Sequence, residues 1–123
     1  MIIGSVNARF ERVIKVPVED STRQEYEVEA VLDTGFTGSL TLPPSLIANL
    51  NLTWRSRSSA VIANGNVVQF DIYTATINWD GVLRSILIQA IDNVPLLGMA
   101  LLAGHDLRAR VAVGGAVEIE AVQ

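Results

Sequence analysis

The sequence predicts an all-β domain, a closed or nearly closed β-barrel with one or two short helices. Apolar and polar side chains alternate with a period of two, most clearly over residues 25–32. Two tight-turn dipeptides, Asn64-Gly65 and Asp80-Gly81, separate strand-like segments. Many short strands joined by regular turns are typical of barrels and sandwiches.

Composition limits the classes of protein to consider. The chain has 123 residues, 50% of them hydrophobic and 18% charged, which predicts one folded domain over residues 1–123. The net charge of −4 and the lack of a basic stripe argue against nucleic acid as a partner. With no cysteine, a disulfide framework, a thiolate zinc site and a cysteine nucleophile are excluded. The other aspartates and the single histidine show no metal-binding spacing, so we expect neither metal nor cofactor.

The first half of the chain predicts three strands and a helix. A strand over residues 10–18 ends at a polar stretch, and residues 25–32 form a second strand with one wet face. A short apolar strand over residues 40–42 precedes Pro43-Pro44, which opens a helix with Leu46, Ile47 and Leu50 at helical spacing.

The second half predicts hairpins and a terminal pair of strands. Asn64-Gly65 predicts a type I′ turn between strands 58–63 and 67–79, and Asp80-Gly81 leads into a strand over 82–91. The remaining expected elements are a short strand over 94–97, a helical turn over 99–103, and strands over 108–113 and 116–122.

The residues with the most chemical meaning are Asp33, Thr34 and Gly35. The acidic side chain directly follows a buried apolar strand, a position that an ordinary surface turn does not require. Gly35 permits a tight backbone there. The alternative interpretation is a turn aspartate or a helix N-cap.

A second motif lies far downstream, at Pro95, Leu96, Leu97 and Gly98, and is followed by a predicted helical turn. With both motifs in this order around a hairpin, the sequence resembles the retropepsin-like aspartic proteases. The helix after Pro43-Pro44 favours the cellular and bacterial single-domain members over the viral enzymes.

The resemblance implies an aspartic endopeptidase that acts on a peptide or protein substrate. Asp33, Thr34 and Gly35 would be the catalytic triplet, with the Thr34 hydroxyls bonding across a dimer interface, and Leu96, Leu97 and Gly98 the supporting motif. The substrate-binding flap would have its tip at Ile62, Ala63, Asn64, Gly65 and Asn66.

The chemistry requires two carboxyl groups, one as base and one as acid. The chain contains one Asp-Thr-Gly triplet, so we expect a C2 homodimer with Asp33 near its axis. The family commonly pairs terminal strands at this interface, for which residues 116–122 are the candidate.

Three departures from the family pattern leave an alternative open. Met99 follows Gly98 where viral enzymes usually carry an arginine brace, so that any brace would come from elsewhere, with Arg108 or Arg110 as candidates. Phe36 stands where a small residue is common, and the flap has one glycine. The alternative is a catalytically weak or silent dimerisation or peptide-binding module with the same fold.

The sequence shows no signal peptide, and its most apolar run, residues 95–104, is too short to cross a bilayer. We therefore expect a cytoplasmic protein without a membrane partner. His105, the single histidine, is expected at a surface or helix end, and Trp54 and Trp79 in the core or at the barrel rim.

Overall fold

The computed structural model describes residues 1–122, which form ten β-strands and two short helices. The elements in chain order are β1 (Ile2–Val6), β2 (Arg12–Glu19), β3 (Glu25–Leu32), β4 (Leu40–Leu42), α1 (Pro44–Leu50), β5 (Thr53–Val61), β6 (Val67–Trp79), β7 (Val82–Ala90), β8 (Leu96–Leu97), α2 (Met99–Leu102), β9 (His105–Ala109) and β10 (Ala116–Ala121).

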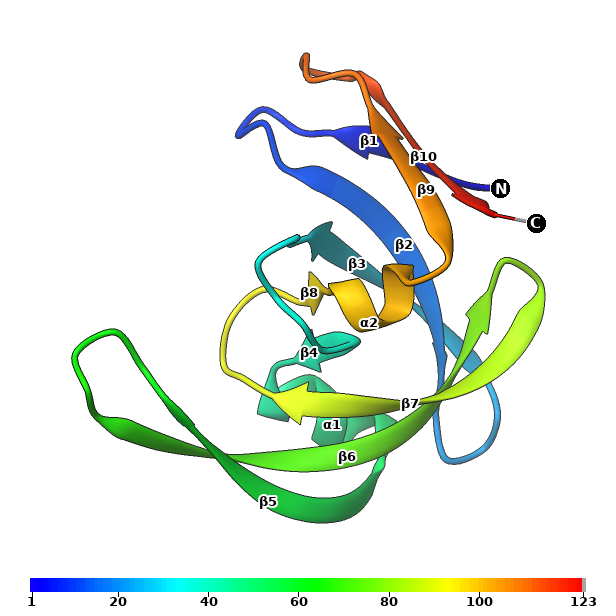
Figure 1. Ribbon diagram of the computed structural model, residues 1–123. Coiled ribbons are helices and arrows are strands. Elements are labelled where there is room, and N and C mark those ends of the chain that lie inside the picture. The colour runs from blue at the N-terminus through cyan, green and yellow to red at the C-terminus, as the bar shows by residue number, and fades with distance from the viewer. Residues whose placement is uncertain (123) are drawn as a thin grey trace.

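The strands form one strongly curved sheet in the order β5-β6-β7-β4-β8-β3-β2-β1-β10-β9 (Figure 1). Strands β2 and β6 also meet, but at a single register pair, Val18 with Ile77. The mostly-β prediction is confirmed, whereas the predicted closed barrel is not. β2 is paired along its length with β3, and the sheet continues past β2 into β1, β10 and β9 instead of closing.

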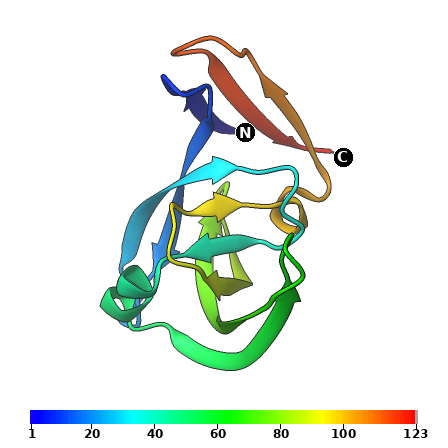
Figure 2. The same ribbon diagram turned by 90° about the vertical axis from the view of Figure 1, so that its left-hand side faces the viewer.

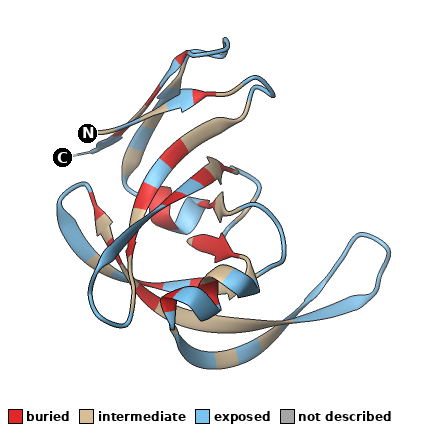
Figure 3. Cartoon of the chain, turned by 180° about the vertical axis from the view of Figure 1, so that it is seen from behind, coloured by how far each residue is buried: buried red, intermediate tan, exposed pale blue. Residues whose placement is uncertain are grey.

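The core lies inside the curve of the sheet, and the period-two pattern decides which side chains enter it. In β3 the buried residues are Val28, Ala30 and Leu32, and in β10 they are Val117 and Ile119. The intervening glutamates 25, 27 and 29 are exposed. Burial concentrates in the middle of the molecule, whereas the outer turns and the tip of the long β5–β6 hairpin are exposed (Figure 3). The other end of β6 enters the core with Ala75, Ile77 and Trp79.

Three of the hairpin turns share one backbone geometry. In each, the N–H of the first residue donates to the carbonyl of the fifth, and the N–H of the fourth donates to the carbonyl of the first. This is a type I turn followed by a left-handed residue. The turns are Asn7–Glu11, Asp20–Gln24 and Ile62–Asn66, with Phe10 (φ 59°), Arg23 (φ 68°) and Gly65 (φ 84°) in the left-handed position.

The predicted type I′ turn at Asn64-Gly65 is therefore wrong. A type I′ turn needs positive φ at both central residues, and here Gly65 has it while Asn64 does not. Asp80 and Gly81, with φ of 54° and 85°, meet that requirement and join Trp79 to Val82 as a two-residue turn.

The C-terminal strands differ from the prediction in bounds and in pairing. β9 begins at His105, and residues 110–115 form a turn in place of the predicted end of the strand. β10 lies between β1 and β9 and pairs with both. Because both of its edges are occupied within the chain, β10 offers no free edge to a partner strand, and the free edge at this end of the sheet belongs to β9.

Candidate active site

Asp33 is placed by the pairing of β3 with β8. The two strands run parallel, with Val31 opposite Leu96 and Leu32 opposite Leu97. The N–H of Asp33 continues this ladder by donating to the carbonyl of Leu97 at 2.9 Å. β8 also pairs with β4 on its other side, so β3, β8 and β4 lie side by side (Figure 2). The two motifs found in the sequence are thus brought together.

The Asp33 carboxylate is half-buried and sparsely bonded. The N–H of Gly35 donates to Oδ1 at 2.9 Å, and the N–H of Phe36 donates to the Asp33 main-chain carbonyl at 3.1 Å. Among residues 1–122 the bond from Gly35 is the one hydrogen bond that the carboxylate accepts, and Oδ2 has no protein partner. The backbone is therefore fixed while one carboxylate oxygen stays available.

Gly98 holds the loop after Asp33 in place. Its N–H donates to the carbonyl of Ser39 at 2.9 Å, and the next N–H, of Met99, donates to the carbonyl of Phe36 at 2.8 Å. A Cβ at Gly98 would collide with the Gly38 carbonyl and would lie 2.5 Å from the Phe36 ring. The residue must be glycine because two loop backbones and a ring meet at this point.

Phe36 packs against this junction. Its ring lies beside both Gly38 and Gly98, since a Cβ built on either glycine would touch it. The bulky side chain thus fills a space that small residues leave open and contacts the support of the loop.

Thr41 is a supporting residue that the sequence analysis missed. It is 1% exposed, and its Oγ1 accepts a hydrogen bond from the N–H of Leu96 at 2.9 Å. A threonine between two buried leucines was the available signal, but its partner lies 55 positions away in the chain.

Arg12 contacts the end of β3. Its Nη2 donates to the carbonyl of Leu32, the residue before Asp33, at 3.4 Å. Arg108, one of the two arginines suggested as a brace, instead forms an exposed ion pair with Glu118 at 3.2 Å. Arg12 is thus the basic side chain that reaches the end of β3.

The predicted flap is a long hairpin of β5 and β6. Its tip rises on the side of the molecule toward which the loop after β3 also projects (Figure 1). Ile62, Ala63, Asn64, Gly65 and Asn66 are all exposed, as is Thr34. The hairpin exists as predicted, and its tip stands apart from the core.

The other expectations concern metals, membranes and single aromatic residues. Residues 1–122 contain no group of three or more potential metal-ligating side chains. Within the described chain no helix is long and apolar enough to span a membrane. Trp79 is buried and donates through Nε1 to His105 Nε2 at 3.1 Å, whereas Trp54 is 56% exposed.

Comparison with known structures decides the fold. The crystal structure of a retropepsin-like aspartic protease from Rickettsia conorii matches with a TM-score of 0.62, over 99% of this chain and 91% of that chain. This chain has a retropepsin-like fold. The sequence identity is 17%, so the likeness concerns the retropepsin-like fold alone. No family model and no curated protein matches the sequence.

Proposed function

We propose that this protein is an aspartic endopeptidase that works as a C2 homodimer, with one Asp33 carboxyl from each copy. The retropepsin-like fold supports the proposal. The observation that carries it is the geometry of Asp33, whose main chain is anchored to Leu97 while its Oδ2 has no partner among residues 1–122. At Asp20, an aspartate that forms a turn in this chain, Oδ1 instead accepts three hydrogen bonds.

Two copies are required by the chemistry. A single carboxyl group cannot be base and acid at the same moment. Two carboxyls about 3 Å apart cannot both ionise, so the pair shares one proton. The resulting pKa values belong to the pair and not to either Asp33.

The proposed reaction is a direct attack by water. The ionised Asp33 takes a proton from a water molecule while the water oxygen bonds to the scissile carbonyl carbon. The protonated Asp33 of the other copy donates its proton to the carbonyl oxygen. In the second step one Asp33 gives its proton to the amide nitrogen while the other Asp33 takes a proton from a hydroxyl of the tetrahedral intermediate. The C–N bond breaks as the carbonyl re-forms, the products are a carboxylic acid and an amine, and the dyad again holds one proton. The two Asp33 residues exchange roles during the reaction.

The proposed substrate is an extended peptide cleaved between apolar residues. The flap, with its tip at Ile62–Asn66, would cover it and contribute main-chain hydrogen bonds, as strand addition does. Val61 and Val67, at the ends of β5 and β6, are 72% and 63% exposed and offer apolar contacts.

The test is a mixing experiment. Wild-type protein at fixed concentration is titrated with Asp33→Asn, and hydrolysis of a fluorogenic peptide library is followed between about pH 3 and pH 8. We expect activity to fall as the variant is added, because mixed dimers hold only one ionisable Asp33. Asp20→Asn, which alters an aspartate at the opposite end of β3, is the matched control and should leave the wild-type rate unchanged. Undiminished activity in the presence of excess Asp33→Asn would contradict a shared site.

A peptide-binding or assembly module of the same fold is the alternative. A stable dimer that cleaves no peptide over this pH range, while retaining peptides in an Asp33-independent way, would favour the module. Cleavage that a pepstatin-type inhibitor blocks would favour the protease.

A further inference from the structure

The Asn7–Glu11 turn lies at the Asp33 end of the sheet. β2 and β3 are antiparallel, with Val13 opposite Val31. Since β2 begins where β3 ends, the chain that precedes β2 extends past the same end from which Asp33 emerges. The turn between β1 and β2 therefore projects from the same end of the sheet as the Asp33 loop.

This turn is stiff. The side chain Oδ1 of Asn7 accepts from the N–H groups of Arg9 at 2.9 Å and Glu11 at 3.0 Å. Asn7 Nδ2 in turn donates to Glu11 Oε1 at 3.0 Å. Two further main-chain hydrogen bonds close the turn, so its tip is held in one conformation.

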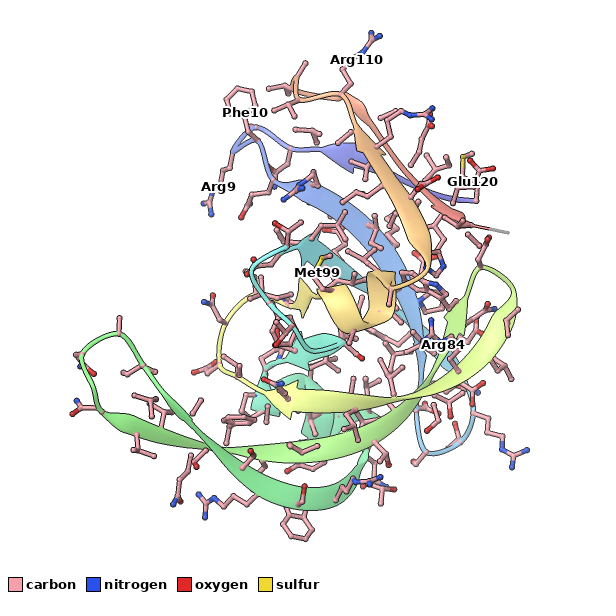
Figure 4. The ribbon with its side chains drawn as sticks, in the orientation of Figure 1. Arg9, Phe10, Arg84, Met99, Arg110 and Glu120 are labelled. Atoms are coloured by element: carbon pink, nitrogen blue, oxygen red, sulfur yellow. The ribbon has the colours of Figure 1, made fainter. Side chains whose placement is uncertain are left out.

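Phe10 occupies the left-handed position of the turn and is 59% exposed. A bulky residue with positive φ is unusual, and the equivalent position of the Ile62–Asn66 turn holds glycine. The ring points outward from the end of the molecule (Figure 4). Neither local backbone preference nor burial within the chain explains an aromatic side chain here.

Other exposed apolar residues lie next to this turn. The β9–β10 turn is joined to β1 by a hydrogen bond from the N–H of Gly114 to the carbonyl of Val6, at 2.8 Å. In that turn Val111 and Val113 are 67% and 65% exposed. The two turns lie side by side in both views (Figures 1 and 2). Phe10 thus belongs to an apolar end of the molecule rather than being an isolated exposed ring.

We propose that the Asn7–Glu11 turn is a dimerisation arm whose Phe10 ring packs against a second copy of this chain. The inference rests on the proposed function, because a shared dyad requires the two Asp33 carboxyls to come within about 3 Å. A rigid turn at the same end of the sheet as Asp33 is on the side of the molecule from which that partner would approach. β10 has no free edge, which leaves the free edge of β9 and side-chain packing to form contacts at this end of the sheet. Aromatic side chains, phenylalanine among them, are enriched in protein–protein interfaces.

The test uses a matched pair of glycine substitutions. Phe10→Gly removes the ring and also relieves the strain of a bulky residue in the left-handed region. Arg23→Gly relieves the same backbone position in the Asp20–Gln24 turn, which lies at the opposite end of β2 and β3. Dimerisation is measured by sedimentation velocity over a dilution series, and folding by thermal unfolding.

We expect Phe10→Gly to raise the dimer dissociation constant at least about tenfold, as loss of an aromatic anchor does. Its unfolding temperature at low protein concentration should not fall. Arg23→Gly should dimerise as the wild type does. A Phe10→Gly protein that dimerises normally, or a wild type that is monomeric at every concentration, would overturn the inference.

The outcome separates the arm from the catalytic proposal. A Phe10-dependent dimer that cleaves no peptide would retain the arm and refute the protease. Wild-type cleavage with normal dimerisation of Phe10→Gly would retain the protease and refute the arm. With Phe10→Gly, peptide hydrolysis should recover at high protein concentration, which a folding defect would not allow.

Discussion

The two ends of β3 each carry an aspartate, and the two are used differently. Before the strand, Asp20 Oδ1 accepts three hydrogen bonds, from Thr22 N–H at 2.8 Å, Thr22 Oγ1 at 2.6 Å and Gln24 N–H at 3.0 Å. After the strand, Asp33 accepts one, from Gly35 N–H at 2.9 Å.

Asp20 forms a turn with its side chain, whereas the main chain of Asp33 is held by a segment distant in sequence. At Asp20 the side chain organises a short exposed turn. At Asp33 a distant segment holds the main chain: the Asp33 N–H donates to the carbonyl of Leu97, and Gly98 N–H donates to the carbonyl of Ser39 in the following loop. A turn aspartate was the competing interpretation of Asp33, and Asp20 shows what that interpretation looks like in this same molecule.

The largest expected effect comes from exchanging each aspartate for asparagine. Asp33→Asn should lower kcat/KM for peptide cleavage by at least about 10³-fold, because it removes both the base and the acid, while the unfolding temperature stays near the wild-type value. Asp20→Asn should keep the activity. Both are measured on the dimer at saturating protein concentration. Equal activity of the two variants would remove the distinction between the ends of β3.

Gly98→Ala should destabilise the fold by about 3 kcal/mol, because its methyl group collides with backbone and with the Phe36 ring. Gly104→Ala is the control for backbone strain alone: its φ is 79° and nothing lies within 4 Å of a Cβ there. That control should cost about 1 kcal/mol. Urea unfolding measures the free energy of unfolding of both variants. Similar losses of stability would contradict tight packing around Gly98.

Thr41→Val should cost about 1–3 kcal/mol, since it leaves the part-buried N–H of Leu96 without its acceptor. Its counterpart at the other end of β3 is Thr22→Val, which removes an exposed hydroxyl bond to Asp20 and should cost less than about 1 kcal/mol. The free energies of unfolding of the two variants show at which end of β3 the threonine hydrogen bond contributes more to stability. A larger loss for Thr22→Val would reverse the comparison.

The smallest effect is in the pH dependence of stability. The pKa of Asp20 is lowered from 3.8, chiefly by the hydrogen bond from the Thr22 hydroxyl. A lowered pKa in the folded state means that this stabilisation is present above 3.8 and is lost as the pH falls through the lowered value. When the pH is lowered from above 3.8 to below the lowered pKa, the free energy of unfolding should therefore drop less for Asp20→Asn than for the wild type. An identical pH dependence would contradict the assignment.

Much of the Asp33 site could be predicted from local sequence. Asp33, Thr34 and Gly35 follow a strand whose alternating pattern is plain, and Leu96–Gly98 is a second recognisable segment. Thr41 and Arg12 were missed because their partners, the N–H of Leu96 and the carbonyl of Leu32, are distant in sequence. Long-range hydrogen bonds of this kind leave no periodic signal.

Turn geometry shows a similar division. Asp80-Gly81 adopts the type I′ turn that its sequence favours, whereas Asn64-Gly65 does not. A dipeptide signals that a hairpin is present, but the register of the two strands decides whether two or more residues lie outside the ladder. Phe10 and Arg23 take left-handed positions that no sequence preference predicts, because the closing hydrogen bonds of their turns hold the backbone there.

The sequence by itself determined the all-β class, the order along the chain of every strand except β1, the α1 helix and the position of the Asp33 motif, because these follow from side-chain alternation and local backbone preference. Tertiary structure alone decided that β8 passes beside β3, that β10 is paired on both edges, and that the curved sheet does not close as predicted. Those features depend on hydrogen bonds between strands far apart in the chain, whose choice of partner is settled by the packing of the whole core.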